Sequence, residues 1–334
     1  MKHIILTKKL AEGKWLKESI LRLNKDLNSI QCFTKDNVID SQVEFADVEV
    51  IFSTWYMPEF SEEEIAALFP SLKVVFYAAG TVKYFAEPFL CRGIQVFSAA
   101  NANGIPVAEY VAAQVVLANK GYYLAQHSYK SFFGLLAFRR SRRFAEAHLG
   151  NCGSKVGLIG FGAVGRQVTR YLRPYKLKVA AYDPFVSDAV FQELGVMRME
   201  LNELFSECDV ISNHLPDIST TKGMLNYELF SKMKDNVTFI NTGRGAQLVE
   251  KDLSKAIRRR KNACAVLDVT RHEPVFPWSP LLWNRKVFIT PHIAGSMSGE
   301  DIRLVEAMMT AYSCFLAGEE SEYEVFLSQL SNRA

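Results

Sequence analysis

Three polar residues in the second half of the chain each follow an apolar, strand-like run. Arg244 lies in NTGRG, Glu273 in DVTRHEP and His292 in TPHIAG. A guanidinium binds a carboxylate through a planar fork of donors, an imidazole exchanges a proton near neutral pH, and a carboxylate fixes its tautomer. Together these groups suit orienting a 2-oxo acid and protonating its ketone oxygen as a hydride arrives. Taken singly, each also fits a structural reading, as an ion pair, a loop acid or a capping or core residue.

A glycine-rich turn, GFGAVG, lies upstream of these residues, between the apolar run 155–159 and a helical pattern. Gly160 permits the tight turn, Gly162 lets backbone amides approach a pyrophosphate, and Gly165 allows close packing of helix on strand. The N-terminus of the helix attracts the anion. Alone, the motif is also compatible with a plain tight turn. The predicted phosphate contacts are Gly160, Gly162, Ala163, Val164 and Gly165.

An acid stands at the end of the next predicted strand. Asp183 follows Gly165 by 18 residues. An acid about 20 residues beyond the turn accepts hydrogen bonds from the adenine ribose hydroxyls and repels a 2′-phosphate. The spacing therefore favours NAD over NADP. The alternative is that Asp183 only begins a turn with Pro184.

Composition excludes several classes of function. The 334 residues suffice for two domains, 49% are hydrophobic and 22% charged, and the net charge of +3 gives no indication of nucleic acid or an anionic membrane as partner. The basic runs at 139–143 and 258–261 are interpreted as solvated helix faces, because no aromatic residues interleave them.

Localisation and metal content follow from what the sequence lacks. The longest helical candidate, 106–129, contains polar residues that do not suit a membrane span, and the start of the chain resembles no secretory signal. We expect a cytoplasmic protein. The six cysteines are dispersed without ligand spacing, so no metal site is expected.

Short β-rich runs alternate with helical patterns along the whole chain, which predicts parallel sheets in an α/β fold. One expected helix is Glu62–Leu68, with Ser61 as its N-cap. The first series of expected strands is 4–7, 48–53, 73–78 and 94–98. The second series is 155–160, 178–182, 209–213, 237–241, 263–267 and 287–290, and it fits a doubly wound dinucleotide fold with the three polar residues at strand ends.

Five motifs in this order resemble those of the D-isomer-specific 2-hydroxyacid dehydrogenase family. They are GLIGFGAVG, HLP at 214–216, INTGRG at 240–245, LDV with EP at 267–274, and TPHIAG at 290–295. Two further segments, 77–81 and 101–110, resemble the substrate-carboxylate loop and the interdomain segment of that family. The resemblance covers nearly the whole chain.

The resemblance implies roles for individual residues. His292 is the expected acid/base, Glu273 its hydrogen-bond partner, and Arg244 the group that binds the substrate carboxylate and carbonyl. Backbone amides around Ala79 and Gly80 would complete the carboxylate site. Further residues expected to bind the cofactor are Asp268, which would hold the nicotinamide amide, and His214, Pro216, Thr221 and Thr242.

The resemblance also implies the architecture. A Rossmann NAD-binding domain is expected over 102–292, and a smaller, discontinuous, flavodoxin-like substrate domain over 1–101 and 293–334, with a helix at 298–316 returning to it. The family suggests a homodimer built on the NAD-binding domain, with 106–129 and 131–148 as candidate contacts. The latter segment lacks a tryptophan that relatives have.

The leading hypothesis is an NAD-dependent D-2-hydroxyacid dehydrogenase that reduces a small 2-oxo acid. The alternative is an NAD(H)-binding, redox-sensing partner protein with little or no turnover, which NADH absorbance with a panel of 2-oxo acids would distinguish. A formate or phosphite enzyme is disfavoured, because the extra site residues of those relatives are not found. The aromatic residues at 53–58, Trp278 and Trp283 are equally compatible with a substrate pocket and with packing.

Overall fold

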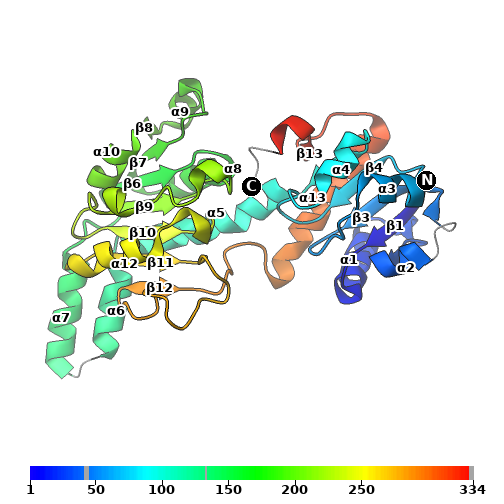
Figure 1. The fold of residues 1–334 in the computed structure, drawn as a ribbon. Helices are drawn as coiled ribbons and strands as arrows, with labels where there is room; N and C mark the ends of the chain where they lie inside the picture. Colours follow the sequence, from blue (N-terminus) through cyan, green and yellow to red (C-terminus); the bar gives the residue numbers. More distant parts are fainter. Residues whose placement is uncertain (41–44, 132–133, 331–334) are drawn as a thin grey trace. The chain divides into compact units, whose positions relative to one another are not determined.

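The computed structural model describes residues 1–40, 45–131 and 134–330. The chain divides into two compact units (Figure 1). Unit 1 is Met1–Asn103 with the described residues from Ser296 onward, and unit 2 is Gly104–Gly295. These boundaries lie two and three residues beyond those expected from the sequence. Each unit is an α/β domain with its own sheet, as the fold class predicted.

Unit 1 contains a six-stranded sheet in the order β13-β5-β4-β3-β1-β2, parallel except for β13. The order of its first five strands is that of a flavodoxin-like fold. Helices cover both faces, with α1 and α13 on one side and α2, α3 and α4 on the other. The strands are β1 Lys2–Leu6, β2 Gln31–Phe33, β3 Val48–Ser53, β4 Val74–Tyr77, β5 Gln95–Ser98 and β13 Glu324–Val325. The helices are α1 Leu10–Leu23, α2 Lys35–Asp40, α3 Glu62–Leu68, α4 Ala86–Cys91 and α13 Ile302–Ala317.

Helix α3 begins where the sequence predicted. The Ser61 hydroxyl accepts a hydrogen bond from the backbone N–H of Glu64 at 3.2 Å, and the Glu64 carboxylate accepts one from the Ser61 N–H at 2.8 Å. This reciprocal pair satisfies two donors that the first turn of a helix leaves without partners. The N-cap prediction is confirmed.

Unit 2 contains a seven-stranded parallel sheet in the order β12-β11-β10-β9-β6-β7-β8. The order reverses beside β6, which creates a crevice at the carboxyl ends of β6 and β9, as in dinucleotide-binding folds. The strands are β6 Cys152–Ile159, β7 Lys176–Tyr182, β8 Met197–Arg198, β9 Val210–Asn213, β10 Thr238–Asn241, β11 Cys264–Leu267 and β12 Val287–Ile289. The helices that connect them are α8 Ala163–Leu172, α9 Asp188–Leu194, α10 Leu201–Glu207, α11 Tyr227–Phe230 and α12 Glu250–Arg259.

The predicted single helix over 106–129 is wrong. The chain forms α5 Ala100–Ala118, then α6 Tyr122–Lys130 and α7 Gly134–Glu146. Gly121 breaks the helix with a φ of 63°, and a Cβ there would lie 2.6 Å from the carbonyl oxygen of Phe144 in α7. Only glycine permits both the left-handed turn and this close approach. Residues 132 and 133 of the segment 131–148 lie outside the described residues.

Three short strands have no counterpart in the prediction, namely β2, β8 and β13. Each has two or three residues and lies at a sheet edge, so it is too short to show an alternating pattern. Within the described residues, no helix is long and apolar enough to cross a bilayer.

Candidate active site

The three polar residues follow three neighbouring strands of unit 2. Arg244 follows β10, Glu273 follows β11 and His292 follows β12, and these strands are adjacent in the sheet. Because parallel strands present their carboxyl ends at one edge, all three residues leave the sheet on the side where such folds bind ligands.

His292 and Glu273 form a hydrogen-bonded ion pair when the imidazole is protonated. Nδ1 of His292 lies 2.7 Å from Oε2 of Glu273, with side chains that are 50% and 42% exposed. The other carboxylate oxygen accepts the backbone N–H of Thr270 at 3.2 Å. Nε2 of His292 has no hydrogen-bond partner within the described chain. Solvent can therefore reach the pair, and the Glu273 contact at Nδ1 leaves Nε2 as the nitrogen for an external group.

Asp268 fixes the backbone that carries His292. Its carboxylate is 2% exposed and accepts hydrogen bonds from the Thr290 hydroxyl at 2.6 Å and from the N–H groups of Ile293 and Ala294 at 2.9 and 2.8 Å. Its carbonyl accepts the N–H of His292 at 2.9 Å. His292 has a φ of 55°, a left-handed conformation that is costly for a residue with a Cβ. These bonds explain how the loop holds it.

Arg244 is half-buried and has no carboxylate partner among the residues that the structure describes. Its Nη1 donates to the carbonyl of Gly243 at 2.9 Å, and its backbone N–H donates to Oε1 of Gln247 at 3.0 Å. An arginine that is partly withdrawn from water without a carboxylate is suited to an anionic ligand. The alternative of a structural ion pair therefore has no support in the described residues.

A buried amide network joins the ends of β9 and β10 beneath Arg244. Asn213 and Asn241 are paired across the two strands, and Nδ2 of Asn213 donates to Oδ1 of Asn241 at 2.8 Å and to Oε1 of Gln247 at 2.6 Å. Nε2 of Gln247 donates to the carbonyls of Leu215 and Pro216 at 2.7 and 3.0 Å. All three amide side chains are fully buried.

The network positions both the Arg244 loop and the loop that follows His214. Sequence reasoning did not identify Asn213, Asn241 and Gln247. The signal was an amide at the last position of each of two apolar strands, since polar groups in such strands are buried and must be paired.

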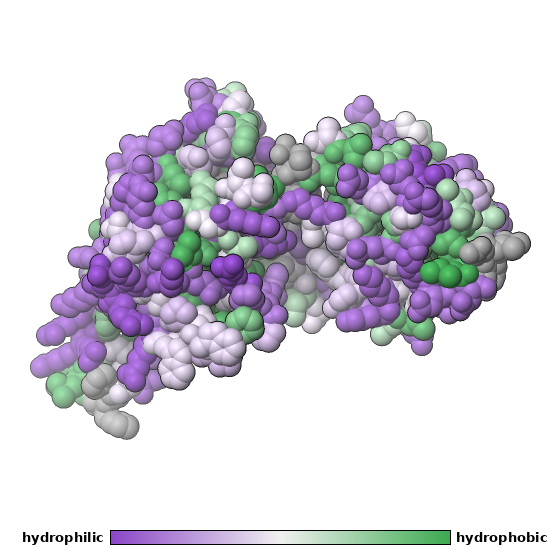
Figure 2. Space-filling view, viewed as in Figure 1, coloured by the Kyte–Doolittle hydropathy of each residue, from purple (hydrophilic) through white to green (hydrophobic). Residues whose placement is uncertain are grey.

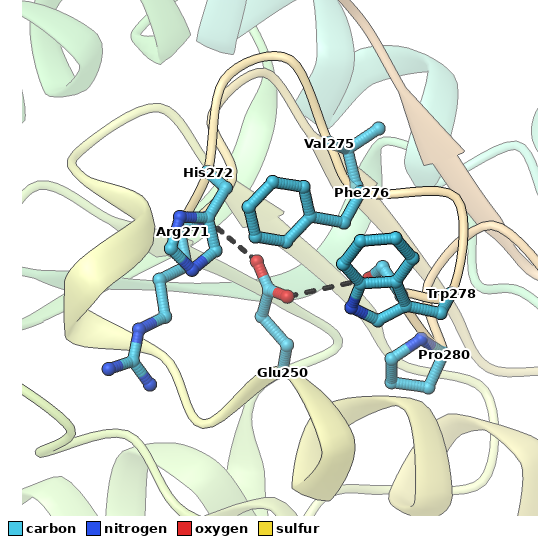
Figure 3. Close-up of a pocket in the computed structure, with 8 residues that line it drawn as sticks. Glu250, Arg271, His272, Val275, Phe276, Trp278 and Pro280 are labelled. Atoms are coloured by element: carbon cyan, nitrogen blue, oxygen red, sulfur yellow. Dashed lines mark hydrogen bonds between the residues drawn. The ribbon is translucent and has the colours of Figure 1, made fainter.

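Two contacts hold the loop between β11 and β12, which carries Glu273. From the start of α12, Oε1 of Glu250 accepts the N–H of Arg271 at 2.7 Å and Oε2 accepts the Ser279 hydroxyl at 3.4 Å (Figure 3). On the inner side, a Cβ at Gly245 would lie 2.0 Å from the carbonyl carbon of Thr270. The loop backbone therefore packs directly on the backbone of the Arg244 loop.

The outer side of this loop forms a pocket of about 290 Å³. Rings of His272, Phe276 and Trp278 stack in sequence, with centroids 4.3 and 4.9 Å apart. Trp278 and Trp283 are each 75% exposed. Pale side chains of intermediate hydropathy cover this part of the surface in Figure 2. Of the residues singled out from the sequence, Trp278 lines this pocket, whereas Arg244, Glu273 and His292 do not.

The glycine-rich turn has the geometry of a phosphate site. Gly160 has a φ of 91°, and a Cβ there would lie 2.7 Å from the carbonyl oxygen of His214; a Cβ at Gly165 would lie 2.5 Å from the Gly160 carbonyl oxygen. At Gly162 a Cβ would meet nothing within 4 Å. Gly162 is the N-cap of α8 and gives the helix no side-chain cap, so the first amides, including those of Ala163 and Val164, remain available to an anion.

Asp183 lies beside this turn. Its Oδ2 accepts the N–H of Phe161 at 2.8 Å and its Oδ1 accepts the N–H of Phe185 at 2.9 Å. The carboxylate is partly exposed and is thus fixed next to the phosphate site. Asp183 therefore begins the predicted turn with Pro184. Its carboxylate also has acceptor positions left for hydrogen bonds from ribose hydroxyls.

Two further predicted cofactor residues have buried polar atoms without partners in the described part of the chain. They are Nε2 of His214 and Oγ1 of Thr242. Burial lowers the pKa of His214 to about 4, so the ring is neutral near pH 7. Thr221 is instead satisfied, because its hydroxyl donates to the carbonyl of Pro216 at 2.7 Å. Buried polar atoms are normally paired, and the two orphaned atoms fit a site that a ligand completes.

In unit 1, Ala79 and Gly80 follow β4. The Ser98 hydroxyl approaches their carbonyl oxygens at 3.3 and 2.7 Å. The N–H of Gly80 has no hydrogen-bond partner within the described residues, although the residue is buried. A buried, unpaired amide donor is the feature expected of a carboxylate-binding loop.

Comparison with known proteins agrees with this architecture. Residues 129–294 match the family described as "D-isomer specific 2-hydroxyacid dehydrogenase, NAD binding domain". The chain is 36% identical over 205 residues to D-3-phosphoglycerate dehydrogenase of Archaeoglobus fulgidus, a match that covers 61% of this chain and 38% of that protein. It is 33% identical to (S)-sulfolactate dehydrogenase of Chromohalobacter salexigens, which covers 70% of this chain and 74% of the relative.

Several of the curated relatives are matched over only 38% to 51% of their length. Among solved structures, the apo form of Rhodotorula graminis D-mandelate dehydrogenase has a TM-score of 0.78, with 20% identity over 97% of both chains. That likeness shows the fold. The strand orders, the glycine-rich turn and the matched sequence segments agree, and the chain belongs to the D-isomer specific 2-hydroxyacid dehydrogenase family, with residues 129–294 as an NAD-binding domain.

Proposed function

We propose that the chain is an NAD-dependent D-2-hydroxyacid dehydrogenase that reduces a small 2-oxo acid. The observation that supports this most directly is the 2.7 Å contact between Nδ1 of His292 and Glu273, together with an arginine at the end of a neighbouring strand that lacks a carboxylate partner in the described chain. A carboxylate at Nδ1 stabilises the imidazolium and presents the proton on Nε2 to a substrate.

In the proposed reaction, Arg244 binds the carboxylate and polarises the adjoining ketone through its planar fork of donors. The bound nicotinamide cofactor would supply the hydride. As negative charge grows on the ketone oxygen, His292 transfers its Nε2 proton to that oxygen, and Glu273 balances the charge of the ring. Asp268 and Gln247 contribute by holding the two loops, which keeps His292 and Arg244 in a fixed geometry.

NAD would bind at the carboxyl edge of the unit 2 sheet. The amides at the start of α8 suit the pyrophosphate, and Asp183 suits the ribose hydroxyls and disfavours a 2′-phosphate. Thr242 and His214 would gain partners for their orphaned atoms. Asp268 already accepts three hydrogen bonds through its carboxylate, and a carboxylate has about four acceptor positions, so one remains for the nicotinamide amide.

Unit 1 is the proposed substrate domain, in which the unpaired amide of Gly80 would bind the substrate carboxylate. The relatives' names support the class of reaction but not one substrate: 3-phosphoglycerate and sulfolactate both carry an anionic group on the third carbon, which hydroxypyruvate lacks. The proposal therefore extends to a 2-hydroxy or 2-oxo acid and specifies no side chain.

The test is a His292→Ala variant, measured by the loss of NADH absorbance with 2-oxo acids. We expect kcat to fall by about 10² to 10⁴, the usual worth of a positioned general acid, while NADH binding persists. The matched control is His272→Ala, which removes an exposed histidine from the loop that carries Glu273 and should leave kcat within about twofold. Unchanged turnover in His292→Ala would overturn the assignment. If wild-type protein bound NADH but reduced no 2-oxo acid, the redox-sensing alternative would replace the enzyme.

A further inference from the structure

A pocket of about 550 Å³ lies entirely within unit 1. Its lining comes from the end of β4, from the loops after β1, β3 and β4, from α1 and from the residues that precede α13. Thr81, which follows Gly80, lines it, and a Cβ at Gly80 would lie 3.4 Å from the ring of Trp55, another lining residue. The pocket thus borders the loop proposed to bind the substrate carboxylate.

Aromatic rings form much of the pocket wall, contributed by Trp55, Tyr56, Tyr77 and Tyr84. The hydroxyls of Tyr77 and Tyr84 lie 3.0 Å apart, which holds these two rings together. The face of an aromatic ring carries negative electrostatic potential and attracts cations. Tyr56 already makes such a cation–π contact within the protein, since the Lys9 ammonium lies 3.7 Å from its ring centroid.

Two carboxylates, Glu12 and Asp301, also line the pocket. Within the described chain, neither has an ion-pair partner, and Oδ1 of Asp301 is buried without a hydrogen bond. Burial raises the pKa of Asp301 most, because it penalises the charged carboxylate, and the like charges of Glu12 and Glu300 raise it further. Because neither acid has an ion-pair partner within the described chain, no protein cation compensates the negative charge around Asp301.

Two other lining residues bear on the charge and polarity of the pocket. The Ser296 side chain is 9% exposed, and its hydroxyl oxygen has no hydrogen-bond partner among the described residues. The cation that lines the pocket, Lys8, is engaged by Glu59 at 3.3 Å, and Glu59 is not a lining residue. The pocket is left with two acids, an unsatisfied hydroxyl and the rings of Trp55, Tyr77 and Tyr84, since Lys9 already covers one face of Tyr56.

We propose that this pocket binds a cationic group, so that the 2-oxo acid reduced by the chain carries a side chain ending in an ammonium or guanidinium ion. The inference rests on the proposed function and names its substrate class. A cation would neutralise the crowded acids, donate hydrogen bonds to Asp301 and Ser296, and lie against the aromatic wall. An anionic side chain, such as a phosphate or sulfonate, would be repelled by both carboxylates.

Steady-state kinetics of the full chain with NADH test the preference. The substrates are 5-guanidino-2-oxopentanoate, 2-oxohexanoate with a neutral side chain, 2-oxoadipate with an anionic side chain and 2-oxogluconate with a polyhydroxylated side chain. We expect kcat/KM for the guanidino acid to exceed that for the neutral acid by at least about tenfold, mainly through KM, with the anionic acid the poorest substrate. A higher kcat/KM for any of the other three would overturn the proposal and leave the dehydrogenase function intact.

The variants Asp301→Asn and Glu12→Gln test the residues. Each should lower kcat/KM for the guanidino acid by about tenfold and leave that for 2-oxohexanoate unchanged, because the neutral side chain needs no counter-charge. Glu62→Gln, an exposed acid in the first turn of α3, is the matched control and should change neither value. Equal losses for both substrates would indicate a structural role and contradict the subsite.

Calorimetric titration of 5-guanidino-2-oxopentanoate into the protein without NADH separates the two proposals. If no 2-oxo acid is reduced but the guanidino acid binds and Asp301→Asn abolishes binding, the subsite stands and the proposed enzyme function fails. If the guanidino acid neither binds nor reacts, the cation subsite is overturned as well.

Discussion

Several of the polar groups to which we assign chemistry lack protein partners. Within the described chain, Arg244 has no carboxylate partner, and Nε2 of His292, Nε2 of His214 and Oγ1 of Thr242 have no hydrogen bond. Asp268, by contrast, is engaged by the loop that carries His292. Unpaired buried groups are costly, and a ligand that pairs them would bind with a corresponding gain.

Arg244→Lys keeps the positive charge but loses the planar fork. We expect kcat/KM for a 2-oxo acid to fall by about tenfold to a hundredfold, because a lysine cannot bind carboxylate and carbonyl with parallel donors. NADH affinity, measured by fluorescence titration, should stay within about twofold of wild type. A wild-type kcat/KM in this variant would contradict the proposal that Arg244 binds the substrate carboxylate and ketone.

His214 predicts a pH dependence of stability. Burial lowers its pKa from 6.5 to about 4 in the folded chain, so the unfolded chain binds the proton more tightly. The stabilisation from the neutral ring is fully present above pH 6.5 and is lost as pH falls toward 4, by up to about 3 kcal/mol. Urea unfolding of wild type and His214→Gln at pH 7, 5 and 4 should show a smaller loss in the variant. Parallel losses would contradict the assignment.

At the scale of elements, strand ends are fixed by buried contacts between loops. The Asn213, Asn241 and Gln247 amides hold the loops after β9 and β10, and Gly245 brings the Arg244 loop against the β11–β12 loop. Both contacts are rigid, because a fully bonded amide network has one arrangement and a backbone-to-backbone contact cannot relax through a rotamer.

Gly245→Ala tests this packing. The new methyl would lie 2.0 Å from the carbonyl carbon of Thr270 and 2.3 Å from the backbone nitrogen of Arg271, so the β11–β12 loop must shift and Glu273 with it. We expect a loss of about 1–3 kcal/mol in the free energy of unfolding and at least about a tenfold fall in kcat.

The control for this variant is Gly299→Ala. A Cβ at Gly299 would meet nothing within 4 Å, so neither stability nor kcat should change appreciably. If Gly245→Ala behaved like this control, the close contact between the two loops would not matter for catalysis.

At the scale of the whole molecule, the hairpin of α6 and α7 exposes apolar side chains. Tyr129 is 56% exposed, Leu135 63%, Leu136 75% and Phe138 49%. Figure 2 shows hydrophobic side chains at the end of this hairpin. Exposed apolar groups of this size are typical of interfaces. The predicted homodimer through the NAD-binding domain therefore remains our expectation, with the hairpin as its contact.

Leu136→Asp should shift the protein from dimer to monomer in size-exclusion chromatography with light scattering, because a charge in an apolar contact is left unpaired. Leu23→Asp, which places a charge on a 44% exposed leucine of unit 1, is the control and should keep the wild-type mass. A monomeric wild type would contradict the expectation.

Much of the fold follows from local patterns in the sequence. The ten predicted strands occur near their expected positions, because buried parallel strands are continuous apolar runs, and Ser61 marks the start of α3 because its hydroxyl caps the next turn. The break at Gly121 and the edge strands β2, β8 and β13 were missed. The requirement for glycine at position 121 comes from the close approach of the Phe144 carbonyl in another helix. The short edge strands form only because they pair with neighbouring strands.

The chemistry of the candidate site could likewise be predicted from residue types, since few reactions use a guanidinium, a carboxylate and an imidazole at successive strand ends. The tertiary structure alone decided that His292 reaches Glu273, that Asp268 holds the histidine loop, and that three buried amides link β9 to β10. Sequence reports periodicity over a few residues, whereas these contacts join residues that lie 19 to 34 positions apart and exist only once the strands pair.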